Sequence, residues 1–209
     1  MPECSGSRVT AAVFPGEPER SVYNNALLER PDAVPAMEAA YAEAGVTRFA
    51  AWVHENDEAT RSALDRRGYR LDQTTRAMGM ALEDVRLPRP QLDLGSVEWG
   101  GYLRIFGLSP GLLSRADRTA FRVLVARLDD ENVATAMAFD HGSDTGIYNV
   151  GTLEHARRRG LGTALTALHV HDALARGLRT ATLQATEMAE GMYAAVGFRD
   201  LGRILEFVP

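Results

Sequence analysis

The spacing of hydrophobic and polar residues changes once within residues 147–176, and this change organises the rest of the sequence. Residues 147–152 are rich in β-branched and aromatic side chains and follow Gly146, which is typical of a strand. From Leu161 onward the apolar residues recur at steps of three and four, the spacing of a helix with one buried face. The sequence therefore predicts a strand that passes into a helix through residues 154–162.

Similar patterns predict the elements on either side of this strand and helix. Residues 123–128 and 133–139 are expected to form two strands joined by a polar turn, and residues 180–208 give strand, short helix, turn and strand. Farther upstream, residues 100–106 are expected to form a strand and residues 112–121 a short helix. The second half of the chain is thus expected to be an antiparallel meander that leads into a β-α unit.

The first half of the chain has a comparable order of predicted elements. Strands are expected at residues 8–14, 21–28 and 48–54, and helices at residues 33–44 and 58–67. A pair of strands is expected at residues 70–82. The Gly-aromatic-Arg pattern of residues 68–70 occurs again at residues 197–199. We interpret this order as a diverged internal repeat. The alternative is that both halves simply use ordinary strand-helix-strand units separated by turns.

A division into domains follows from the repeat. We expect a degenerate half-domain at residues 1–85, a linker with two prolines at residues 86–96, and a second domain at residues 97–209. The prolines of residues 31–35, and the absence of glycine there, exclude a loop of backbone donors like the one at residues 154–162. The first half is therefore expected to have a structural role.

Composition and charge narrow the class of protein. The net charge of −5 argues against general nucleic-acid binding, because neutralising phosphates requires a basic surface. Cys4 is the sole cysteine, so no intrachain disulfide is possible. The first 20 residues lack the pattern of a signal peptide, and no stretch reaches the ~18 apolar residues of a membrane span. We expect a cytoplasmic protein with neither a nucleic-acid nor a membrane partner.

The junction between the predicted strand and helix has the chemistry of an anion site. The first N–H groups of a helix have no partner within it, and the peptide dipoles place partial positive charge there. Gly160 and Gly162 carry no Cβ, so a ligand can approach the backbone closely. The adjacent guanidinium groups of Arg157, Arg158 and Arg159 suit phosphate oxygens. Together these features predict a diphosphate site.

Two common phosphate-binding patterns do not fit this junction. A P-loop requires a lysine, and all basic residues of this chain other than histidine are arginine. A dinucleotide fingerprint requires a third glycine where this chain has Leu165.

Arg157, Gly160 and Gly162 instead match the pattern [RQ]-x-x-G-x-[GA] between a strand and a helix. This segment resembles the acetyl-CoA loop of the GNAT family, the GCN5-related N-acetyltransferases. The family's second signature, a tyrosine four residues before a Gly-Phe pair, is met by Tyr193, Gly197 and Phe198. The resemblance covers roughly residues 97–209 and implies an α/β (α+β) fold with a mixed, mostly antiparallel sheet flanked by helices. The first half would then be a degenerate half of a tandem form.

The resemblance also implies a set of site residues and a reaction. The chain is expected to be an N-acyltransferase that moves an acetyl group from acetyl-CoA to an amine by direct transfer. Tyr193 would be the general acid, and Thr186 would contact the cofactor. The pantetheine arm would pair with backbone groups of Val150, Gly151, Thr152 and Leu153. The diphosphate would be held by Arg157, Arg158, Arg159, Gly160, Leu161, Gly162 and Thr163.

The general base and the acceptor stay open at this stage. Glu154, His155, Asp140, Asp144 and His141 lie near the predicted strand, but none is assigned as base, and ordered water is an alternative. No metal site is expected, because His169 and His171 are two residues apart on one helix and point in different directions.

Two alternatives to an enzyme remain: a non-catalytic acyl-CoA-binding or regulatory module, and, more remotely, an RNA contact of the basic loop. Trp99, Tyr102, Met137 and Tyr148 are candidates for an apolar acceptor pocket or for ordinary core. A monomer or a homodimer is compatible with the sequence.

Overall fold

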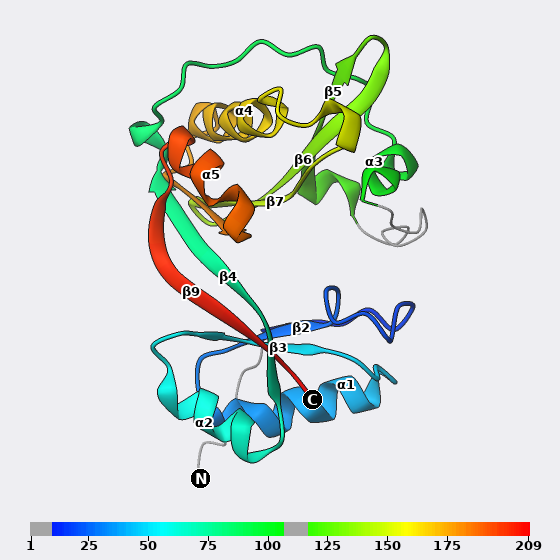
Figure 1. The fold of residues 1–209 in the computed structure, drawn as a ribbon, viewed down its shortest axis with the longest axis vertical. Helices are drawn as coiled ribbons and strands as arrows, with labels where there is room; N and C mark the ends of the chain where they lie inside the picture. The colour runs from blue at the N-terminus through cyan, green and yellow to red at the C-terminus, as the bar shows by residue number, and fades with distance from the viewer. Residues whose placement is uncertain (1–9, 107–116) are drawn as a thin grey trace. The chain divides into compact units, whose positions relative to one another are not determined.

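A computed structural model describes residues 10–106 and 117–209 of the chain (Figure 1). Strands β4 (Arg70–Ala81) and β9 (Arg199–Val208) each contribute residues to two compact units. The first unit comprises Met1–Thr75 with Gly202–Pro209, and the second comprises Arg76–Leu201. Among the residues that the structure describes, no helix combines the length and the apolar composition needed to cross a membrane.

The first unit packs two helices on one face of a sheet with the order β1-β2-β3-β9. Pairing is parallel between β2 and β3 and antiparallel between β3 and β9. Met37, Tyr41 and Leu64 of the two helices are fully buried against alternate strand residues. Its other elements are β1 (Thr10–Ala12), β2 (Asn25–Leu28), η1 (Pro31–Ala33), α1 (Val34–Glu43), β3 (Ala50–His54) and α2 (Glu58–Arg66).

The second unit has a sheet with the order β4-β8-β7-β6-β5 and helices on both faces. Pairing is antiparallel except between β7 and β8, which are parallel. Its elements besides β4 and β9 are η2 (Leu82–Asp84), α3 (Trp99–Ile105), η3 (Arg118–Ala120), β5 (Phe121–Leu128), β6 (Glu131–His141), β7 (Asp144–Thr152), η4 (Glu154–Ala156), α4 (Leu161–Ala175), β8 (Thr180–Ala185), η5 (Glu187–Ala189) and α5 (Glu190–Val196).

Successive residues of β6 pack on opposite faces of this sheet. Ala136 belongs to a buried cluster with Leu165 of α4, whereas its neighbour Met137 packs with Tyr102 of α3. Because successive side chains of a strand point to opposite faces, α3 and α4 cover opposite sides of the meander. The expected mixed, mostly antiparallel sheet flanked by helices is confirmed.

Two of the predicted elements are wrong. Residues 100–106 were expected to form a strand, but they lie in α3 and its C-cap, because Tyr102 and Phe106 are spaced one helical turn apart and pack on one side. The pair of strands expected at residues 70–82 is one 12-residue strand, β4. The helix expected at residues 112–121 falls largely outside the described residues.

The strands that follow α2 and α5 leave the unit in which those helices lie. After α2, β4 enters the second unit and pairs antiparallel with β8. After α5, β9 enters the first unit and pairs antiparallel with β3. The compact units therefore begin and end elsewhere than the domains expected at residues 1–85 and 97–209, and those domains and the internal repeat stay predictions.

The pairing of β4 with β8 predicts that a residue from the first half of the sequence stabilises the second unit. Met78 of β4 is 3% exposed and shares a buried cluster with Leu183 and Phe198. We expect Met78→Ala to lower the free energy of unfolding by about 2–4 kcal/mol, because it leaves a cavity in that cluster. Urea unfolding followed by circular dichroism measures this change. Met188→Ala, at a methionine that is 93% exposed, is the matched control and should change stability little.

Candidate functional site

Strand β7 contains a bulge that divides it into two parts. Thr135 of β6 pairs with Gly151 and Met137 pairs with Tyr148, so β7 has one extra residue between these pairs. Asn149 lies in this interval with a φ of 49°, in the left-handed region that asparagine tolerates better than most residues.

The ladder between β7 and β8 ends before this bulge. It joins residues 144–147 of β7 to residues 180–183 of β8, and in the described chain it goes no farther. Past Ile147, the edge of β7 that faced β8 is open, while its other edge stays paired with β6. An open strand edge accepts an extended ligand or peptide through main-chain hydrogen bonds.

The N-terminus of α4 lies next to the open edge, since a Cβ placed on Gly162 would lie 3.5 Å from the Cγ1 of Val150. Gly160 is the N-cap residue with a φ of 76°, and the first helical hydrogen bond runs from the N–H of Ala164 to the C=O of Gly160. The N–H groups of Leu161, Gly162 and Thr163 precede this bond and have no partner within the helix. A Cβ placed on Gly160 would meet nothing within 4 Å, so no other residue packs against this turn at Gly160.

Three arginines immediately precede this helix end in the chain. Arg157, Arg158 and Arg159 are all exposed, and the Nε of Arg157 donates to the C=O of Thr152 at 3.2 Å. Arg158 has a φ of 64°, a strained conformation for a residue with a Cβ. Three cations at the positive end of a helix dipole are unfavourable unless an anion lies among them. The arrangement therefore suits a multiply charged anion such as a diphosphate.

Tyr193 lies in the core beside this site. It is 6% exposed and meets Phe198 edge-on, with ring centroids 6.1 Å apart. Burial raises the pKa of Tyr193 to about 12, so its phenol is protonated at neutral pH. The preceding residue, Met192, lies against α4, with its Sδ 3.0 Å from the position that a Cβ of Gly162 would take.

The remaining residues of the implied cofactor site differ in exposure and in whether their backbone groups are already hydrogen-bonded. Val150 is half-buried, and Thr186 is exposed directly after β8, on the side where β7 and β8 are no longer paired. Leu153 donates its N–H to the C=O of Val133 at 2.8 Å and accepts from the N–H of Ala156 at 3.0 Å. Both backbone groups of Leu153 are thus engaged, and we leave this residue out of the open edge.

The sequence alone does not predict that Asn149 connects β7 to α3. Its Nδ2 donates to the hydroxyl of Tyr102 at 2.7 Å, and the Tyr102 hydroxyl lies 3.7 Å from the Sδ of Met137. The bulge therefore holds α3 as well as opening the edge of β7. An asparagine between Tyr148 and Val150, inside an apolar strand, was the available signal for a left-handed residue. Of the pocket candidates, Tyr102 and Met137 are buried core, whereas Tyr148 is 49% exposed.

Acidic and histidine side chains near the bulge are engaged elsewhere. His155 lies 3.1 Å from the Oε2 of Glu131 in an exposed pair. Asp144 accepts hydrogen bonds from the hydroxyls of Thr180 and Thr182, at 2.7 Å each. No general base is assigned among these residues.

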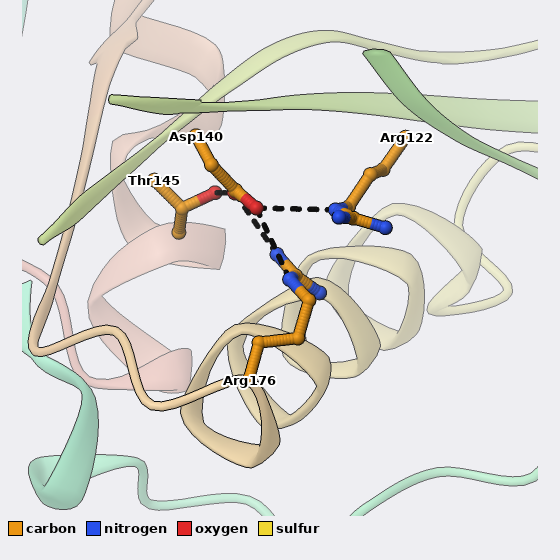
Figure 2. A network of polar contacts seen from close by, with 4 residues as sticks. All are labelled: Arg122, Asp140, Thr145 and Arg176. Atoms are coloured by element: carbon orange, nitrogen blue, oxygen red, sulfur yellow. Dashed lines mark hydrogen bonds and ion pairs between the residues drawn. The ribbon is translucent and has the colours of Figure 1, made fainter. Parts of the chain in front are cut away.

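Asp140 is the centre of a polar network that fixes the C-terminal end of α4 (Figure 2). Arg176, the C-cap residue of α4, donates to both carboxylate oxygens, at 2.9 and 3.1 Å. Arg122 of β5 and Thr145 of β7 donate to the same carboxylate, at 3.1 and 2.8 Å. Although partial burial alone would raise the pKa of Asp140, these hydrogen bonds hold it below its ordinary value. Asp140 therefore anchors the helix and is poorly suited to accept a proton.

The two histidines of α4 have different surroundings. His169 is 2% exposed, and burial lowers its pKa to about 4, so it is neutral at physiological pH. His171 lies 2.9 Å from the C=O of Leu87 through its Nε2. In residues 10–106 and 117–209, no group of three or more His, Cys, Asp or Glu residues could hold a metal ion.

Comparisons with known proteins find similarity to one family of acetyltransferases. Residues 119–200 match the family model described as acetyltransferase (GNAT) domain. These residues include the bulge of β7, the N-terminus of α4 and Tyr193. A comparison with curated protein sequences finds no match.

Solved structures with a similar fold include several GNAT proteins. A GCN5-related N-acetyltransferase from Kribbella flavida is 19% identical, with a TM-score of 0.69 over 90% of this chain and 83% of its own. One from Sphaerobacter thermophilus is 13% identical, with a TM-score of 0.65 over 96% and 75%. A tandem GNAT protein from the clavulanic acid biosynthesis pathway is 14% identical, with a TM-score of 0.58 over 88% and 74%. At these identities the likeness concerns the fold.

The network around Asp140 gives a prediction for stability and its pH dependence. We expect Asp140→Asn to lower the free energy of unfolding by about 1–3 kcal/mol at pH 7, because it removes charge-assisted hydrogen bonds. Because the folded-state pKa is depressed, the carboxylate stabilises the fold above its ordinary pKa of 3.8 and loses this effect as the pH falls below that value. Chemical unfolding at pH 7 and at pH 3 measures both effects.

The difference between Asp140→Asn and the wild type should shrink at the lower pH. Glu131→Gln, which changes an exposed carboxylate with 57% side-chain exposure, is the matched control and should have little effect at pH 7. An Asp140→Asn variant as stable as the wild type at pH 7 would show that this network does not anchor α4.

Proposed function

We propose that this chain, whose residues 119–200 match the model of a GNAT acetyltransferase domain, transfers an acetyl group from acetyl-CoA to an amine by direct transfer. One observation carries the proposal: the open edge of β7 lies next to a helix N-terminus whose first N–H groups have no partner within the helix and which follows three exposed arginines. The first feature suits an extended amide-bearing arm and the second suits a diphosphate. Coenzyme A has both parts in this order.

The residues that would hold acetyl-CoA fall into three groups. Backbone groups of Val150, Gly151 and Thr152 would pair with the pantetheine arm along the open edge of β7. The N–H groups of residues 161–163, with Gly160 as the turn, and the side chains of Arg157, Arg158 and Arg159 would bind the diphosphate. Thr186 would contact the arm from the end of β8. When bound, acetyl-CoA supplies the reactive thioester.

Tyr193 is the residue that we assign to proton transfer. Attack of the amine on the thioester carbonyl forms the C–N bond and breaks the C–S bond, so the thiolate gains a proton and the amine loses one. The phenol of Tyr193 stays protonated, since burial raises its pKa to about 12, and it can donate to the thiolate. No side chain is assigned to take the proton from the amine, and water is the acceptor in this scheme.

A second function, an acyl-CoA-binding module without catalysis, is favoured by one observation. Three of the five acidic and histidine residues considered as a base have other partners: Asp140 is held by Arg176, Asp144 by two threonines, and His155 by Glu131. Under this reading Tyr193→Phe changes no function, and no amine accelerates release of the thiol. If the chain is an acetyltransferase, Tyr193→Phe lowers the rate of thiol release with an accepted amine and leaves acetyl-CoA binding intact.

The tandem origin with a degenerate first half, a monomeric or homodimeric state and a cytoplasmic location complete the proposal. The tandem GNAT protein named above has a similar fold and supports the first of these. The acceptor is proposed only as an amine of a small molecule or protein.

Titration calorimetry with acetyl-CoA tests the binding step. We expect Arg157→Ala to weaken binding ~10-fold, because one charge-assisted contact is lost. Gly160→Asp should abolish binding, because it places a negative charge at the helix N-terminus where the diphosphate would lie. Arg179→Ala, at another exposed arginine, is the control for the first variant.

Gly177→Asp is the matched control for Gly160→Asp. Gly177 has a φ of 86° at the other end of α4, and it too has nothing within 4 Å of an added Cβ. The two variants therefore share the backbone strain and the charge change, and only the position differs. Wild-type protein that does not bind acetyl-CoA at ~1 mM would refute the proposed function.

A further inference from the structure

The face of β7 that points toward α3 is capped at Gly151 by an aromatic ring. A Cβ added to Gly151 would lie 2.4 Å from the Cε1 and 2.6 Å from the Cζ of Phe106. These distances are far below van der Waals contact, so the ring occupies the space that a side chain at position 151 would take. Gly151 follows the bulge and pairs with Thr135 of β6.

Phe106 is held in this position by its neighbour one helical turn earlier. The rings of Phe106 and Tyr102 meet edge-on, with centroids 5.7 Å apart and an interplanar angle of 64°. The Tyr102 hydroxyl in turn accepts the hydrogen bond from Asn149 at 2.7 Å. Two aromatic residues on one side of α3 therefore contact the bulged segment at two points, Asn149 and Gly151.

The contact lies on the strand segment that would carry the reactive end of the ligand. This step rests on the proposed function, in which the pantetheine arm pairs with backbone groups at residues 150–152. The acyl group would then lie near Gly151, which offers no side chain of its own. The apolar ring of Phe106 would be the surface that an acyl chain meets on the α3 side of this segment.

We propose that Phe106 sets the acyl-chain length that this protein accepts, by admitting an acetyl group and excluding chains of four or more carbons. A methyl group gains apolar contact with the ring without displacing it. A longer chain has to displace the ring from Gly151 and from Tyr102. Phe106 is thus a specificity-determining residue, distinct from the residues that bind the diphosphate.

The alternative is that Phe106 only packs α3 against the sheet. Under that reading, truncation of Phe106 lowers stability but leaves the preference among acyl chains unchanged. A control residue for this alternative is Phe121, which packs against the same cluster of Tyr102, Leu103 and Met137 and meets Phe139 at 5.7 Å. The three atoms nearest to an added Cβ at Gly151 all belong to Phe106 and none to Phe121.

Calorimetric titration of the full chain with acetyl-CoA, butyryl-CoA and hexanoyl-CoA tests the proposal. We expect the wild type to bind butyryl-CoA and hexanoyl-CoA at least ~10-fold more weakly than acetyl-CoA, and Phe106→Ala to bind all three equally or to prefer the longer chains. Phe106→Leu, which keeps an apolar side chain and guards against loss of folding, should have an intermediate ratio. Phe121→Ala should keep the wild-type ratio.

The outcomes separate this inference from the function on which it rests. Wild-type binding of all three thioesters with equal affinity would overturn the role of Phe106 and leave acyl-CoA binding in place. An unchanged ratio in both Phe106 variants would do the same. Failure of the wild type to bind any of the thioesters would overturn the proposed function and this inference together.

Discussion

The bulge at Asn149 is the constraint on which the rest of the candidate site depends. A regular strand at this position would continue its ladder with β8, and its edge would be closed by backbone hydrogen bonds. The extra residue and the left-handed φ of Asn149 accompany the end of that ladder at Ile147. The same residue donates a hydrogen bond to Tyr102 and so connects the strand to α3. One backbone irregularity therefore opens one edge of β7 and fixes the helix over its face.

The two ends of helix α4 differ in how their polar groups are satisfied. Its C-terminal end is fixed by Arg176 and Asp140, which join it to β5, β6 and β7. Its N-terminal end has a glycine cap, free N–H groups and exposed arginines. A cation at the C-terminus of a helix is favourable, whereas cations at the N-terminus are unfavourable without a bound anion. The fold thus keeps one end of the helix satisfied within the protein and leaves the other suited to a ligand.

The part of the site that the sequence predicts is local. The change from strand to helical spacing near Leu161, together with Gly160 and Gly162, predicts the end of β7 and the start of α4, because both depend on neighbouring residues. The bulge is also local, but a single asparagine is too weak a signal to predict it. Residues 100–106 were read as a strand, since alternation and helical spacing are hard to distinguish over seven residues.

The parts that the sequence does not predict depend on long-range contacts. The pairing of β4 with β8 joins residues about one hundred positions apart, and nothing in either strand specifies the partner. Gly79 in β4 gives room to the side chain of Leu201, whose Cδ1 is 2.8 Å from the position of an added Cβ. The contact of Phe106 with Gly151 has the same origin, because it depends on how α3 packs on the sheet.

Hydrogen–deuterium exchange of the full chain, with and without acetyl-CoA, tests the central claim most directly. The account predicts slower exchange at the amides of residues 161–163 and at those amides of residues 148–152 that point away from β6, where a helix N-terminus and an open strand edge would both become hydrogen-bonded. The amide of Leu153, already bonded to Val133, should exchange at the same rate in both states. Protection confined to other segments, or no protection with acetyl-CoA bound, would contradict the account.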